Sequence, residues 1–143
     1  MVSLNCTGQF LRTFERLLKK KNHYFSVPID ISNHFNNTCY SDLCKIGELR
    51  KTLNHLKFIK VRLNNSGMKK GDRGGFRVYF LADSKTETIT FLTIYPKTGP
   101  LQCALLSPKE EAMLLEDYIE AKKHNSLIAV SSFMGIPTQE ALR

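Results

Sequence analysis

FIKVRL at residues 58–63, FRVYFLA at residues 76–82 and TITFLTIY at residues 88–95 are the segments from which the architecture of this chain can be predicted. Each is rich in β-branched and aromatic residues, and turn-like sequence separates it from the next, which predicts three β-strands. Because short links between consecutive strands favour neighbours in one sheet, we predict an antiparallel meander. The third segment is apolar on both parities, which is typical of a strand in the middle of a sheet.

Two helices are predicted before these strands. Residues 8–21 carry apolar side chains at helical spacing, and Thr7 is placed to cap the first turn. Leucine and isoleucine residues at helical spacing between positions 43 and 56 indicate a second helix, which Gly47 weakens slightly. Residues 22–40 are polar and contain a proline, which predicts an irregular segment with one short extended piece at residues 26–31 and no assigned role.

A capping box marks the start of a last helix. Ser107 can cap the helix, a proline follows it, and Glu110 can return a hydrogen bond to the cap, so we predict a helix to about residue 123. We expect one domain over residues 1–125, with residues 126–143 as a tail or short extra element. The predicted fold class is α+β, with N-terminal helices packed on a small antiparallel β-sheet and a C-terminal helix.

Length and charge narrow the class of partner. The 143 residues, 42% of them hydrophobic, suffice for one ordinary core. The 21 Lys and Arg residues against 13 Asp and Glu residues give a formal net charge of +8, which favours nucleic acid as a partner. No long apolar run and no lipidation signal is present, so we expect no membrane partner. The first ten residues lack the pattern of a signal peptide, so we expect a cytoplasmic protein.

Neither a metal nor a cofactor is expected. The four cysteines include no Cys-x-x-Cys pair, and the four histidines do not combine with them at zinc spacing. Gly71, Gly74 and Gly75 do not lie between a strand and a helix, so they indicate a turn and not a phosphate-binding loop.

Basic residues are concentrated in one part of the chain. Residues 57–79 contain seven Lys or Arg residues and one acidic residue, Asp72. Because alternate side chains of a strand share a face, each predicted strand presents its basic and aromatic residues together. If the three faces coincide, six side chains form one surface: Lys60, Arg62, Arg77, Tyr79, Tyr95 and Lys97. A solvated face without function explains one such strand, and the agreement of three strands favours a site.

Three motifs follow one another in the second half of the chain: KGDRGGFRVY at residues 70–79, FLTIYPK at residues 91–97 and LSPKEE at residues 106–111. In this order and spacing they resemble the RelE/ParE toxin superfamily, especially the HigB-like branch of RelE toxins. The resemblance covers residues 58–120. It implies a RelE-like fold and a toxin of a type II toxin–antitoxin system. Such a toxin is a metal-independent mRNA endoribonuclease that acts on the ribosome and binds a cognate antitoxin. The short first strand of that family is not evident here.

The chemistry of RNA cleavage suggests a role for each residue of the site. Attack of the 2′-hydroxyl on the adjacent phosphate needs a base, an acid and cations that stabilise the phosphoryl oxygens. The predicted catalytic residues are Lys60, Arg62, Arg77, Tyr95 and Lys97. The arginines are the expected phosphate clamps, and either lysine or the tyrosine would exchange protons. The predicted RNA-binding residues are Arg73, Lys69, Lys70 and Tyr79. We expect no His or Glu on this surface, and little role for Arg77 in stability.

Two other functions fit parts of the pattern. A ParE-like toxin would bind and poison DNA gyrase without being an enzyme. A non-catalytic RNA-binding module is suggested by RGGFRVYF at residues 73–80, which shares a basic, glycine and aromatic pattern with RNA-recognition motifs. Gly75 and Arg77, however, stand where that motif needs base-stacking aromatic residues. Arg77 together with the Tyr95-x-Lys97 ending favours the nuclease.

Overall fold

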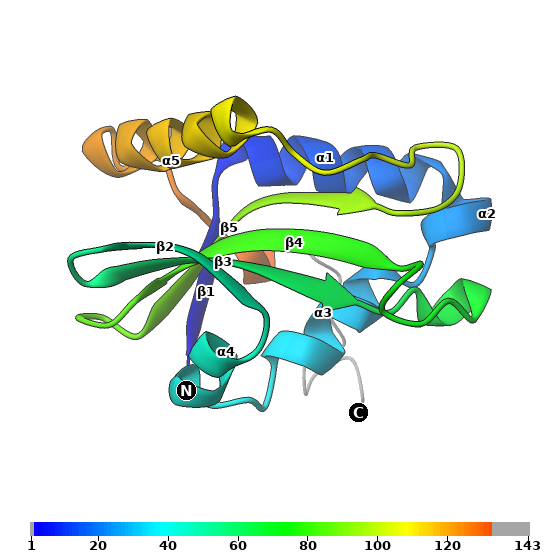
Figure 1. The fold of residues 1–143 in the computed structure, drawn as a ribbon, viewed down its shortest axis with the longest axis horizontal. Helices are drawn as coiled ribbons and strands as arrows, with labels where there is room; N and C mark the ends of the chain where they lie inside the picture. Colours follow the sequence, from blue (N-terminus) through cyan, green and yellow to red (C-terminus); the bar gives the residue numbers. More distant parts are fainter. Residues whose placement is uncertain (1, 133–143) are drawn as a thin grey trace.

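The computed structural model describes residues 2–132, and six strands in one sheet form its centre (Figure 1). The strands are β1 (Ser3–Cys6), β2 (Glu48–Leu53), β3 (Leu56–Leu63), β4 (Phe76–Asp83), β5 (Thr88–Pro96) and β6 (Ile128–Ala129). The helices are α1 (Gly8–Lys19), α2 (Lys21–Tyr24), α3 (Val27–Phe35), α4 (Tyr40–Lys45) and α5 (Pro108–Lys123), with short 3-10 turns η1 (Ser66–Met68) and η2 (Val130–Ser132). The strand order is β2-β3-β4-β5-β1-β6, in which β1 and β5 are parallel and the other neighbours are antiparallel.

The predicted α+β class and the antiparallel meander are confirmed. Strand β5 lies between β4 and β1, as expected for a segment that is apolar on both parities. Helix α1 begins after Thr7, whose side chain accepts a hydrogen bond from the N–H of Phe10 at 3.3 Å. At the start of α5, Ser107 and Glu110 form the predicted capping box, in which each side chain accepts a hydrogen bond from the other residue's N–H.

The predicted helix between residues 43 and 56 is wrong. Helix α4 ends at Lys45, and the residues that follow form β2, which pairs with β3. Gly47 has a φ of +101°, which stops the helix, and Asn54 has a φ of +54° in the tight turn between β2 and β3. The backbone of β2 is paired with β3, so tertiary pairing overrides a weak helical pattern.

One further expectation for the N-terminal part is wrong, and one element there was not foreseen. The extended piece predicted at residues 26–31 is helical, because Pro28 occupies the first turn of α3, where its missing N–H has no partner to lose. The first strand that was not evident in the sequence is present as β1, next to β5. At the other end, β6 pairs with β1, while residues 133–143 of the predicted tail lie outside the described residues.

Helices cover the two faces of the sheet unequally. On one face, Phe10 of α1 and Phe35 of α3 pack against Phe91 in the main core. On the opposite face, called the α5 face from here on, Tyr118 of α5 joins a smaller cluster with Leu81 of β4. Because α5 covers only part of this face, the ends of β3, β4 and β5 nearest the 64–75 loop carry polar side chains there.

Gly75 provides a test of this arrangement, because it closes the connection between β3 and β4. A Cβ at this position would lie 1.9 Å from the carbonyl oxygen of Leu63, whereas a Cβ at Gly71 would have no atom within 4 Å. We expect Gly75→Ala to lower the free energy of unfolding by at least about 3 kcal/mol, since backbone must move to admit the methyl group. Gly71→Ala is the matched control, with a change within about 0.5 kcal/mol. Urea denaturation of both variants measures this, and equal stabilities would contradict the close approach.

Candidate functional site

The register of the sheet brings five of the predicted residues together. Lys60 lies opposite Tyr79, Arg62 opposite Arg77, and Arg77 opposite Tyr95. Directly opposed residues of an antiparallel pair have Cβ atoms about 4.5–5.5 Å apart. The five side chains therefore form one patch on the α5 face, which we call the cationic cluster.

A β-bulge in β5 places Tyr95 in this cluster. Tyr79 pairs with Thr93 while the next residue, Phe80, pairs with Phe91, so Leu92 is an extra residue in the strand. Simple alternation would put Phe91 and Tyr95 on the same face. The bulge separates them, so that Phe91 enters the main core and Tyr95 faces the cationic cluster.

Arg77 is buried, with 6% of its surface exposed. Its guanidinium donates hydrogen bonds to the carbonyl oxygens of Asp72 at 2.8 Å, Arg73 at 3.1 Å and Phe76 at 3.2 Å. Burial lowers the pKa of Arg77, and the charge of Arg62 lowers it further. Two of the five guanidinium N–H groups thus hold the end of the 64–75 loop, a third bonds to the first residue of β4, and two have no partner among residues 2–132.

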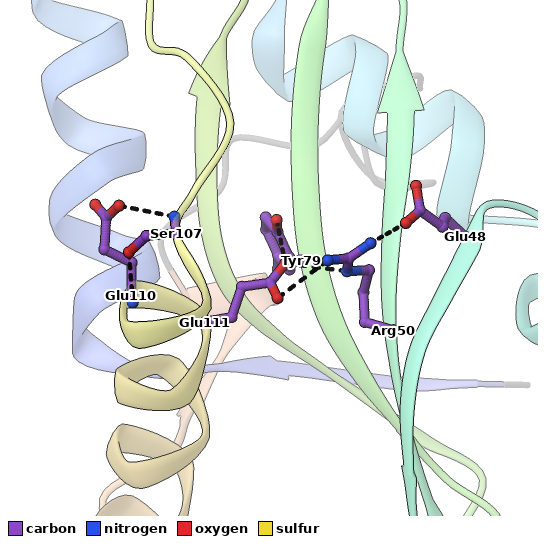
Figure 2. Close-up of polar contacts among 6 residues, drawn as sticks. All are labelled: Glu48, Arg50, Tyr79, Ser107, Glu110 and Glu111. Atoms are coloured by element: carbon purple, nitrogen blue, oxygen red, sulfur yellow. Dashed lines mark hydrogen bonds and ion pairs between the residues drawn. The ribbon is translucent and has the colours of Figure 1, made fainter.

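Tyr79 belongs to a polar network that crosses the α5 face (Figure 2). Its hydroxyl donates to Glu111 of α5 at 2.7 Å, and Nε of Arg50 on β2 donates to the same carboxylate at 3.0 Å. Arg50 also pairs with Glu48. Burial raises the pKa of Tyr79, and its hydrogen bond to Glu111 raises it further, so the hydroxyl keeps its proton. With 1% of its surface exposed, Tyr79 is in place to hold α5 and is covered from solvent.

The expectation of no Glu on this surface is wrong, and the three network residues Glu48, Arg50 and Glu111 were missed. Two of them lie in the segment assigned to a helix, and Glu111 arrives from the start of α5. The β2–β3 register shifts at Arg50, and such a bulge can re-aim a side chain toward a site. The signal that was available is the pair of acidic residues after the capping Ser107, which the sequence places in the first turn of α5.

Lys60 lies between this network and the arginines. Its ammonium is 5.9 Å from the centroid of the Tyr79 ring and makes no ion pair among residues 2–132. Burial lowers the pKa of Lys60. The charges of Glu48 and Glu111 act to raise it, and those of Arg50 and Arg77 act to lower it further. A pocket of about 310 Å³ opens beside it. The pocket is lined by Ile46, Gly47, Glu48, Lys60, Val61, Arg62 and Asp72.

Tyr95 carries a polar atom with no assigned partner. Its hydroxyl is buried and makes no hydrogen bond within residues 2–132. The Tyr79 ring lies beside the Tyr95 ring, with centroids 6.4 Å apart. Burial raises the pKa of Tyr95 above its ordinary value. The hydroxyl therefore keeps its proton at neutral pH.

The remaining predicted residues surround the cationic cluster. Lys97 follows the end of β5, and its ammonium donates to the carbonyl of Cys103 at 3.4 Å. Lys69, Lys70 and Arg73 are exposed on the 64–75 loop, and Arg77 holds the backbone of that loop. None of these four forms an ion pair within the described part of the chain.

Within residues 2–132 no group of three or more His, Cys, Asp or Glu side chains is arranged to hold a metal ion. None of the described helices is both long enough and apolar enough to cross a membrane. No model of a known protein family matches the chain, and no curated protein matches it.

The contacts of Arg77 revise the expectation that it matters little for stability. We expect Arg77→Ala to lower the free energy of unfolding by about 2 kcal/mol, because three carbonyl groups lose a charged donor. Arg62→Ala is the matched control, since Arg62 is exposed, lies opposite Arg77 and makes no ion pair within the described residues. Its loss should leave stability unchanged or raise it. Urea denaturation compares them, and an Arg77→Ala variant as stable as the parent would show that these bonds contribute nothing.

Proposed function

We propose that this protein is the toxin of a type II toxin–antitoxin system and that it cleaves mRNA in the cytoplasm, on the ribosome, without a metal ion. The observation that supports this most directly is the placement of Arg62 opposite Arg77, with neither paired to a carboxylate within residues 2–132. Like charges directly opposed destabilise a sheet. An anion bound between them would offset that cost, and a phosphodiester matches the two-point geometry of guanidinium groups.

The cationic cluster can supply the base, the acid and the phosphate-binding cations that cleavage needs. Arg62 and the two free N–H groups of Arg77 would bind the phosphoryl oxygens. Lys60 would accept the proton of the 2′-hydroxyl, and its lowered pKa increases the fraction of neutral amine available for this. As the 2′-oxygen attacks phosphorus, the bond to the 5′-oxygen breaks, and Tyr95 would donate its proton to that oxygen. The products are a 2′,3′-cyclic phosphate and a free 5′-hydroxyl.

A partner protein is part of this proposal. A free enzyme that cuts mRNA would arrest the growth of its own host, so an antitoxin must bind it between episodes of activity. The exposed cations of the site, Arg62 among them, suit an acidic segment of such a partner. The extent of the basic surface supports the same conclusion, because Lys69, Lys70 and Arg73 extend it beyond the catalytic residues.

The decisive experiment is incubation of the purified protein with mRNA, with and without ribosomes, followed by analysis of the fragment ends. We expect fragments with 5′-hydroxyl and cyclic phosphate ends, and a loss of rate of about a hundredfold or more in Arg62→Ala, because one donor to the developing charge is removed. Binding without cleavage would show that the protein is an RNA-binding module and not an enzyme. Growth arrest with intact RNA and inhibited gyrase would show that it is a gyrase poison.

The proposed base predicts a pH dependence with a definite sign. The rate should rise with pH and level off above the pKa of Lys60, and Lys60→Arg should bind RNA but lose cleavage, because arginine stays protonated. Glu111 is one of the groups that raise the pKa of Lys60, so Glu111→Gln should move the rising limb to lower pH. Glu110→Gln is the control, because Glu110 bonds to Ser107 and is not among those groups (Figure 2). An unshifted profile for Glu111→Gln, or an active Lys60→Arg, would exclude Lys60 as the base.

A further inference from the structure

Residues 23–30, to which the sequence assigns no role, contact both loops beside the cationic cluster. One is the 64–75 loop, which follows Arg62 and carries Lys69, Lys70 and Arg73. The other begins after β5, just beyond Tyr95, and carries Lys97. Figure 1 shows α2 and the start of α3 at the end of the sheet where both loops emerge, with η1 beside them.

Buried polar side chains tie α3 to the first of these loops. The Ser26 hydroxyl donates to the Asp30 carboxylate at 2.8 Å and accepts from the N–H of Gly67 at 2.9 Å. The same carboxylate oxygen accepts from the N–H of Ser66 at 3.1 Å. Asp30 is 6% exposed and has no cationic partner among residues 2–132. Its contacts therefore serve the loop backbone.

Asn65 completes the attachment. It is buried, its side-chain N–H donates to the carbonyl of His23 at 2.8 Å, and its side-chain oxygen lies 3.1 Å from the Ser26 hydroxyl. Its backbone pairs with that of Lys70 through two hydrogen bonds of 2.9 Å. Lys69 lies within this closed turn with a φ of +55°. The position of both lysines thus depends on a turn that α3 holds.

Tyr24 holds the second loop. Its hydroxyl donates to the carbonyl of Thr98 at 2.9 Å and accepts from the N–H of Leu101 at 3.0 Å. Gly99 has a φ of +88°, and a Cβ there would lie 2.5 Å from the Tyr24 hydroxyl. The loop is therefore closely fitted to this side chain, next to Lys97.

We propose that residues 23–30 are positioning residues for the substrate RNA, because they hold the cations of both loops at set places around the cationic cluster. The proposal rests on the proposed function, since it concerns phosphates on either side of the cleaved bond. The loop cations have no ion-pair partner among the described residues that could fix them otherwise. A cation that is already placed loses less conformational freedom on binding than one on a loose loop.

The test uses Ser26→Ala and Asp30→Ala, which remove the acceptors of the loop N–H groups. Asp30→Asn keeps an acceptor oxygen and should therefore behave nearly like the parent protein. Ser32→Ala is the matched control, because Ser32 lies on the same helix and its hydroxyl bonds to Asn36, away from both loops. Hydrogen exchange of the Ser66 and Gly67 amides should be about tenfold faster or more in the two alanine variants. Unchanged exchange in a folded variant would show that α3 does not hold the loop.

A second measurement asks whether the anchor acts on RNA. Binding of a single-stranded RNA with 2′-O-methyl groups, which cannot be cleaved, should weaken about tenfold in Ser26→Ala. The slope of log K against log salt concentration should become shallower by about 1.4, since two phosphate contacts are lost and each contributes about 0.7 for a single strand. The rate at saturating cleavable RNA should stay within about twofold of the parent, because uniform binding alone is lost. A purely structural role would not change the salt slope.

The double variant separates the remaining outcomes. In a Lys69→Ala/Lys70→Ala background, Ser26→Ala should cause no further loss of affinity, since its effect passes through those two lysines. An additive loss would overturn the positioning role. If the parent protein neither binds nor cleaves RNA, the proposed function fails, and the role of residues 23–30 toward RNA fails with it. The exchange of the Ser66 and Gly67 amides still decides whether α3 anchors the loop.

Discussion

Burial of β4 between two paired strands is the constraint on which this structure depends. All eight of its residues are buried, with Val78 and Phe80 in the main core and Tyr79 and Leu81 under α5. A central strand can admit a charged residue only where its donors find acceptors. For Arg77, two carbonyl groups at the end of the 64–75 loop and the carbonyl of Phe76 accept three of its five N–H groups. The central strand and the loop beside it are therefore parts of one arrangement, joined by a single guanidinium.

Charge on the α5 face is balanced unevenly, and this distinguishes residues that hold the structure together from those proposed to act in function. Arg50 is held by Glu48 and Glu111, and Tyr79 shares the second of these carboxylates, so this part of the network ties β2, β4 and α5 together. Arg62 and Lys60 have no such partner among residues 2–132. Cations left without partners on a folded surface lower stability unless an anion binds there. This uneven balance is the physical basis of the proposal that a phosphate binds between Arg62 and Arg77.

Segments distant in sequence complete the site. Helix α5 brings Glu111 to the α5 face, and α3 brings Asp30 and Ser26 to a loop about forty residues further along the chain. Both use partly buried hydrogen bonds to charged or hydroxyl groups, which are directional and therefore set position more sharply than apolar contact does. The proposed catalytic residues lie on three strands, while the geometry of the cationic cluster depends on helices from both ends of the described chain.

Local chemistry in the sequence was sufficient for the strands β3 to β5, the capped helices α1 and α5, and the common face of Lys60, Arg62, Arg77 and Tyr79. These features follow from alternation and capping, which involve residues close in sequence. Tertiary structure alone decided the rest. Strand β2 replaced a helical pattern because β3 offered it a partner, and the bulge at Leu92 turned Tyr95 toward Arg77. The burial of Arg77 and the position of Glu111 on the α5 face depend on contacts between distant segments, which no local pattern encodes.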